Sequence, residues 1–116
     1  MSKSFRRRVA VTGVGVVNPF GGDTTDFFER LLRGQSAVRL YVHPTAPFRL
    51  VQPAVVCDAF DGEQAVGRAI SHVTDRFSQL GVSAAFSAWA DAGLAREGAG
   101  SDDYGVSWST GVDSMH

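Results

Sequence analysis

The sequence predicts one α/β domain, and three stretches lead to that prediction. The first is an apolar run over residues 8–17, whose lack of strict alternation is typical of a parallel strand covered on both faces. The second is an amphipathic helix over residues 23–33, which follows after a short turn. The third is a helix over residues 75–93, apolar on nearly all sides and followed by another predicted strand. Strands that alternate with helices indicate an α/β fold.

The first strand, Arg8–Val17, is predicted to end in a turn at Asn18–Gly22. Basic residues before it give a faint likeness to a secretion signal, but Gly13 and Gly15 interrupt the apolar run and no small-residue cleavage site follows. In the helix Asp23–Arg33, acidic residues stand near the start and arginines near the end, which complements the helix dipole. Its apolar face is formed by Phe27, Phe28, Leu31 and Leu32.

The stretch Asp75–Gly93 predicts a long helix, with Asp75 and Thr74 as caps and Gly93 as its end. Its polar residues fall in one narrow row at four-residue spacing: Asp75, Gln79, Ser83, Ser87 and Asp91. A helix that is apolar on all other sides is predicted to lie buried between layers. A chain of 116 residues can hardly supply a layer on each side.

The rest of the chain is harder to divide. Short strands are expected within Ser36–Val42 and over Ala54–Cys57, because prolines favour an extended, irregular path in this region, and Asp58–Arg68 is predicted to be loop and turns. A polar loop, Leu94–Asp103, leads to the last strand, Tyr104–Gly111, in which large residues alternate with small ones. The small-residue face of that strand is expected to pack on the long helix.

The composition is that of an ordinary globular domain, with 44% hydrophobic and 20% charged residues, which argues against disorder. No apolar run approaches the length of a bilayer span, and a net charge of −1 gives no general case for nucleic acid. Residues 1–49 nevertheless carry eight basic and three acidic residues, and the remainder carries three and nine. The two halves are expected to neutralise each other in the fold; the alternative is that the basic half attracts an acidic partner.

Gly13-Val14-Gly15 after a strand approaches a dinucleotide-binding fingerprint. Asn18 stands where the third glycine belongs, Pro19 follows well before the helix begins, and no second strand ends in an acidic residue about twenty positions on. We therefore prefer a structural explanation of the two glycines, a tight turn that needs their backbone freedom.

No other residues form a recognisable catalytic or metal-binding group. The single cysteine, Cys57, excludes an internal disulfide and has no adjacent base, so an inert buried thiol is preferred to a nucleophile, and a reduced cytoplasmic setting fits. Asp102-Asp103 is expected in a solvated loop, and Ser107–Ser109 in backbone packing rather than in a pocket. The histidines lack the spacing of metal ligands: His43, His72 and His116. We assign no catalytic, cofactor-binding or metal-binding residue.

Four segments in order resemble the β-ketoacyl-[acyl-carrier-protein] synthases. Residues 7–21 (RRVAVTGVGVVNPFG) are similar to the opening of that family, and residues 28–38 to the helix end that follows it. Residues 75–94 resemble the family's DRxxQ…DAGL helix, and residues 104–111 its GVxxGTG strand, with Ser109 in place of a glycine. Any one match would be weak, but four in order span nearly the whole chain.

The resemblance implies an incomplete N-terminal part of a thiolase-like αβαβα layered fold, in which a central layer of helices lies between two sheets. It also implies decarboxylative Claisen condensation of acyl and malonyl thioesters in fatty-acid or polyketide biosynthesis. A cysteine holds the acyl group, and two histidines and an oxyanion hole assist. The acidic acyl carrier protein would be the partner, and a homodimer or related heterodimer the assembly. No cofactor, nucleic acid or membrane is implied.

The same resemblance places the nucleophilic cysteine and both histidines beyond the last matched strand. Cys57 and His116 match no catalytic position, so residues 1–116 are expected to be a partial N-terminal domain, truncated before the nucleophile cysteine and inactive alone. Apolar patches and open strand edges should then be exposed. Two alternatives stay open: a non-catalytic synthase-like subunit that pairs with a complete partner, and a nucleotide-binding domain that uses Gly13 and Gly15.

Overall fold

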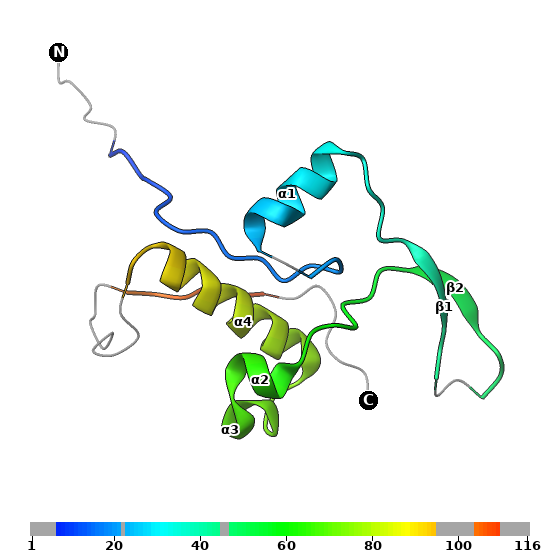
Figure 1. Ribbon diagram of the computed structural model, residues 1–116. Helices are drawn as coiled ribbons and strands as arrows, with labels where there is room; N and C mark the ends of the chain where they lie inside the picture. Colours follow the sequence, from blue (N-terminus) through cyan, green and yellow to red (C-terminus); the bar gives the residue numbers. More distant parts are fainter. Residues whose placement is uncertain (1–6, 22, 45–46, 95–103, 110–116) are drawn as a thin grey trace, which may run out of the picture.

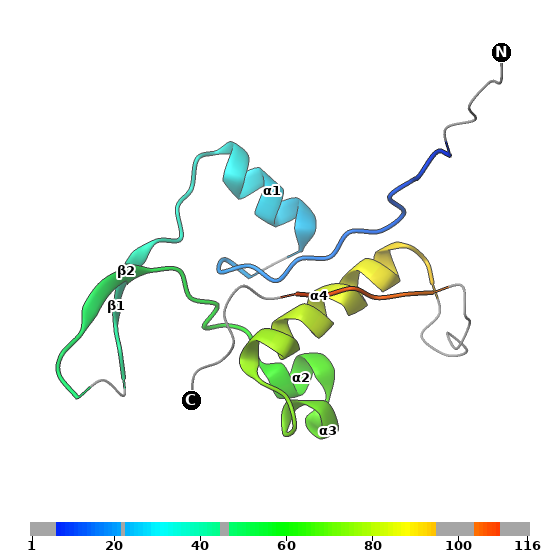
Figure 2. The same cartoon turned by 180° about the vertical axis from the view of Figure 1, so that it is seen from behind.

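The computed structural model describes residues 7–21, 23–44, 47–94 and 104–109. Its elements are, in order, α1 (Thr24–Leu32), β1 (Arg39–Val42), β2 (Val51–Ala54), α2 (Gly62–Val66), α3 (Arg68–Ser71) and α4 (Arg76–Asp91). The N-terminal segment, residues 7–21, passes between α1 and α4, and α2 packs against α4 from the other side (Figure 1). The β1–β2 pair stands apart from α4 in both views (Figures 1 and 2). Helices and strands are mixed, as predicted for a partial α/β domain.

Helix α1 forms where the sequence predicts it. The carboxylate of Asp23 caps it by accepting a hydrogen bond from the backbone N–H of Asp26 at 2.9 Å. Gly34 follows the helix with φ of +68°, a conformation that glycine adopts without strain. The predicted apolar face is present but uncovered: the exposed fractions of Phe28, Leu31 and Leu32 are 60%, 50% and 72%.

Strands β1 and β2 form an antiparallel pair in which Leu40 lies opposite Pro53 and Val42 lies opposite Val51. The strand predicted within Ser36–Val42 is confirmed, as β1. The strand predicted over Ala54–Cys57 was placed too late, because β2 contains Pro53 and ends at Ala54. Among the described residues this sheet has two strands, so each has an edge without a partner. An edge strand tolerates a proline, whose missing N–H need not enter the ladder.

The prediction of loop and turns over Asp58–Arg68 was wrong, because α2 lies within it and α3 begins at its end. The carboxylate of Asp61 caps α2 by accepting from the backbone N–H of Gln64 at 3.1 Å. Gly67, with φ of +85°, separates the two short helices. The cap was visible in the sequence as an acidic residue three positions before a glutamine.

Helix α4 is confirmed, and Gly93 with φ of +70° follows its end as predicted. Its start differs from the prediction in detail. Asp75 occupies the N-cap position, but its side chain makes no capping hydrogen bond. The hydroxyl of Thr74 donates instead to the carbonyl oxygen of Ile70 at 2.6 Å, and so closes the end of α3.

The predicted burial of α4 is not reached within this chain, where Gly81 is the one residue of α4 that is buried. The accessible surface of the chain is 9861 Å², whereas a compact monomer of this mass exposes about 6,100 Å². The radius of gyration is 18.4 Å, against about 13 Å for a compact chain of this length. Within the described ranges, no helix is long and apolar enough to cross a membrane.

The predicted strands over 8–17 and 104–111 do not form as strands in the described residues 8–17 and 104–109; residues 110 and 111 lie outside the description. A strand exists by backbone pairing, and the described sheet contains β1 and β2 alone. Several apolar side chains of both segments are therefore left open to solvent, and the exposed fractions of Val9, Val11 and Val106 are 93%, 82% and 83%.

Both unpaired segments nevertheless run along α4 in a consistent direction. Gly13 lies at Ala88 and Ala92 near the end of α4, and Gly15 lies one turn earlier, at Ala84 and Ala88. The rings of Tyr104 and Trp89 meet at 5.2 Å, while Trp108 lies against Gly81, again earlier in the helix. Each segment thus runs antiparallel to α4, and the two run parallel to each other. This is the course of a strand–helix–strand unit without the hydrogen bonds between its strands.

The face by which residues 104–109 contact α4 is the opposite of the one predicted. Two of the large side chains contact the helix: the ring of Tyr104 meets Trp89, and the indole of Trp108 would lie 2.8 Å from a Cβ placed on Gly81. Gly105, on the small-residue face, has nothing within 4 Å of the corresponding position. The small residue that permits close packing is therefore in the helix rather than in the segment. The polar loop predicted over Leu94–Asp103 lies, after Leu94, outside the described residues.

Candidate functional site

The glycines of the N-terminal segment mark its closest approach to α4. A Cβ placed on Gly13 would lie 2.1 Å from the carbonyl oxygen of Ala88, and one placed on Gly15 would lie 2.1 Å from that of Ala84. Side-chain atoms essentially never come so close to backbone oxygen. These two positions therefore admit no side chain unless the segment moves away from the helix.

The prediction that Gly13 and Gly15 provide a tight turn was wrong. Neither is among the described glycines with positive φ. The turn lies further on, where the backbone N–H of Gly21 donates to the carbonyl oxygen of Asn18 at 3.2 Å and Gly21 adopts φ of +71°. Gly13 and Gly15 are needed for their lack of volume, not for their backbone freedom.

Asn18, which stands where a dinucleotide fingerprint has its third glycine, shapes that turn. Its side-chain oxygen accepts a hydrogen bond from the backbone N–H of Phe20 at 3.0 Å, as in an Asx turn. The residue is 7% exposed, and its side-chain nitrogen has no hydrogen-bond partner among the described residues. Glycine could not supply the side-chain acceptor, so the departure from the fingerprint has a structural reason.

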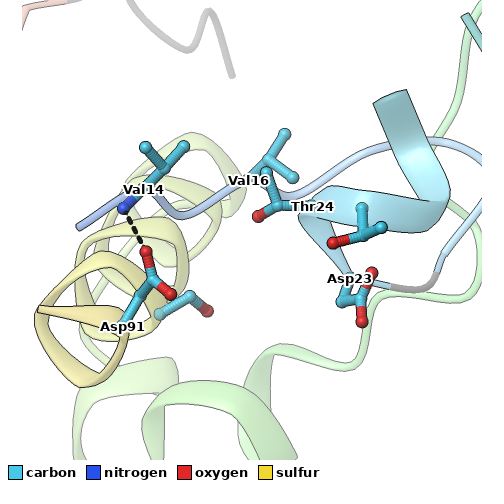
Figure 3. Close-up of a pocket in the computed structure, with 7 residues that line it drawn as sticks. Val14, Val16, Asp23, Thr24 and Asp91 are labelled. Atoms are coloured by element: carbon cyan, nitrogen blue, oxygen red, sulfur yellow. Dashed lines mark hydrogen bonds between the residues drawn. The ribbon is translucent and has the colours of Figure 1, made fainter. Parts of the chain in front are cut away.

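A hydrogen bond between distant parts of the sequence fixes the N-terminal segment on α4. The carboxylate of Asp91 accepts from the backbone N–H of Val14 at 2.8 Å, across 77 positions of sequence (Figure 3). The bond lies between the two glycine contacts, so it sets the position of the segment along the helix. A charged acceptor makes such a bond stronger than a neutral one.

Two residues of the polar row of α4, Gln79 and Asp91, bind parts of the chain outside the helix. The side-chain amide of Gln79 donates to the carbonyl oxygens of Ser71 and Thr74, both at 2.9 Å, and so joins the end of α3 to α4. The hydroxyl of Ser87 donates to the carbonyl oxygen of Ser83 at 3.1 Å. The Ser87 bond stays within α4, whereas Gln79 binds the connection before the helix and Asp91 binds the N-terminal segment.

A cavity of about 530 Å³ opens between the N-terminal segment, the start of α1 and the end of α4 (Figure 3). Two carboxylates and three hydroxyls supply its polar atoms, and its lining residues are Val14, Val16, Asp23, Thr24, Thr25, Ser87 and Asp91. The carboxylate of Asp23 already caps α1, and that of Asp91 already binds Val14. The lining contains no cysteine, histidine or lysine, so it has no nucleophile–base pair of the usual kinds.

This geometry argues against the nucleotide-binding alternative. A dinucleotide site needs glycines whose backbone is open to a pyrophosphate and a helix N-terminus free to bind it. Here Gly13 and Gly15 are covered by α4, and the N-terminus of α1 is occupied by the Asp23 carboxylate. A second carboxylate, that of Asp91, lines the same cavity and would repel an anion.

The titratable residues singled out in the sequence are not assembled into a site. Cys57 is partly buried, and its carbonyl oxygen accepts from the guanidinium of Arg76 at 2.8 Å. His43 follows β1, and His72 stands at the end of α3 within 3.3 Å of Arg68. In the described ranges no three side chains of histidine, cysteine, aspartate or glutamate come together as metal ligands. Asp102, Asp103 and His116 lie outside those ranges.

Residues 1–49, with their excess of basic residues, were expected to pair with the acidic remainder of the chain. One described ion pair, Arg39 with Asp58, joins these two parts. Three other described pairs join residues close in sequence: Asp26–Arg30, Glu29–Arg33 and Glu63–Arg68. These pairs are exposed, so each contributes at most about 1 kcal/mol. Local pairing thus accounts for most of the described contacts between opposite charges.

Comparison with known proteins identifies the class to which this architecture belongs. Residues 6–115 match the family described as beta-ketoacyl synthase, N-terminal domain. The match includes the glycine-bearing N-terminal segment, α4 and the segment after it, which are the parts that pack together here. The chain belongs to this family.

The matching relatives include 3-oxoacyl-[acyl-carrier-protein] synthases and polyketide ketoacyl synthases. A 3-oxoacyl-[acyl-carrier-protein] synthase 2 from Coxiella burnetii is 32% identical over 110 residues, which cover 95% of this chain and 27% of that protein. The oxytetracycline polyketide putative beta-ketoacyl synthase 1 of Streptomyces rimosus is 36% identical over 92 residues, which cover 78% of this chain and 21% of that protein.

A further relative is the tetracenomycin polyketide synthase ketoacyl synthase alpha subunit of Streptomyces glaucescens, 33% identical over 97% of this chain and 26% of its own length. The chain therefore spans about a quarter of the length of the curated relatives it matches. A search of solved structures gave no significant match.

Proposed function

We propose that this chain is the partial N-terminal domain of a β-ketoacyl-[acyl-carrier-protein] synthase. The complete enzyme would join acyl and malonyl thioesters by decarboxylative Claisen condensation, in fatty-acid or polyketide biosynthesis. The observation that carries the proposal is the family match over residues 6–115, together with a relative of which the matched residues cover 27%. A cytoplasmic location belongs to the same proposal.

On this proposal, residues 1–116 supply structure rather than chemistry. The N-terminal segment and residues 104–109 lie on α4 as the start of a layered domain, and the open apolar side chains of Val9, Val11 and Val106 are where further strands would pack. The nucleophilic cysteine and the two histidines would be supplied by the part of the enzyme beyond the last segment that resembles the family. Cys57, a free and partly buried cysteine that matches no catalytic position of the family, is then a structural residue.

The acyl carrier protein and a second synthase subunit are the partners that the proposal implies. The carrier protein is acidic, and residues 1–49 carry an excess of five basic residues, eight against three. The side chains of Arg33 and Arg39 remain 66% and 50% exposed although each has an acidic partner. An exposed basic surface favours the approach of an acidic partner.

A second candidate function is a non-catalytic synthase-like subunit that pairs with a complete synthase. The observation in its favour is the exposed apolar surface of the described residues, since the exposed fractions of Val9, Val11 and Leu32 are 93%, 82% and 72%. Such a subunit would cover its open face with a partner chain instead of with its own continuation.

Two measurements separate these functions. We expect the purified 116-residue chain to show no condensation of acyl and malonyl carrier proteins, and measurable condensation by it would overturn the assignment of a structural role. The intact mass of the polypeptide in its source cells then decides between the candidates. A mass several times 12.4 kDa supports a full synthase, whereas a mass near 12.4 kDa, with co-purification of a complete synthase, supports the non-catalytic subunit.

A further inference from the structure

We draw no further inference here: the strongest candidate, the apolar groove of about 400 Å³ that lies over α4 between residues 15–17 and Trp108, is an uncovered face of the domain already described, and nothing in the structure shows what covers it.

Discussion

Replacing Gly15 with alanine tests the central packing contact of the molecule. The added Cβ would lie 2.1 Å from the carbonyl oxygen of Ala84 and 2.4 Å from the backbone nitrogen of Ala88. Reaching an ordinary separation of 3.4 Å from that oxygen requires a displacement of about 1.3 Å. Both opposing atoms belong to the backbone of α4, so neither can rotate away, and the N-terminal segment must move from the helix.

The cost should be near the upper end of what overpacking produces, about 3 kcal/mol. That value corresponds to a change of about 100-fold in the folding equilibrium. Displacing the segment also lengthens the 2.8 Å hydrogen bond between Val14 and Asp91, since Val14 precedes the substituted residue. We expect Gly15→Ala to lower the urea midpoint, measured by circular dichroism at 222 nm, to which α4 contributes as the longest described helix.

The matched control is Gly105→Ala, because a Cβ at that position meets nothing within 4 Å and Gly105 has no positive φ. Its effect should stay within about 0.5 kcal/mol. Protection of α4 from a protease at fixed time provides a second readout if the unfolding transition is too broad to fit. Equal midpoints and equal protection for Gly15→Ala and Gly105→Ala would refute the reasoning.

Four further outcomes are expected. Asp91→Ala should destabilise the chain by about 1 kcal/mol in urea, because it removes the acceptor for the Val14 N–H. The control Asp91→Asn keeps an acceptor oxygen, so an equal loss of stability in both variants would contradict this role. Asp23→Ala should reduce the helix content through loss of the α1 cap, at a cost of about 1 kcal/mol, while Asp23→Ser should restore most of the loss. The purified chain should self-associate in gel filtration because Val9 and Val11 are exposed; the double change of both residues to serine should shift it toward the monomer, and an unchanged profile would show that association lies elsewhere. Finally, condensation activity should be absent from the purified chain, as stated above, with a full-length family member as the positive control.

Local signals in the sequence were sufficient for several parts of the fold. The Asp23 cap, the amphipathic pattern and Gly34 defined α1 to within a residue or two at each end, because these signals act within the helix itself. Gly93 likewise marked the end of α4. The two short helices were missed, although Asp61 was a capping signal for the first. A helix of five residues has too short an apolar pattern to be recognised by periodicity.

Contacts between distant residues could not be predicted in the same way. The motif Gly13-Val14-Gly15 is compatible with a turn, with a phosphate-binding loop or with close packing, and the choice depends on what lies opposite it. Only the structure places the carbonyl oxygens of Ala84 and Ala88 there. The same holds for Asp91, which belonged to an evident polar row but whose partner, the Val14 N–H, lies 77 positions away.

The sequence by itself determined the family, the helices with strong local signals and the apolar character of α4. Each of these depends on neighbouring residues or on motifs in a fixed order along the chain. The tertiary structure decided which residues pack against the small residues: the backbone of α4 packs against Gly13 and Gly15, and Trp108 packs against Gly81. It also decided that residues 8–17 and 104–109 run parallel on one helix without pairing. A strand is stabilised by hydrogen bonds to its neighbours, so an apolar run specifies the tendency to form one while the other strands of the sheet decide whether it forms.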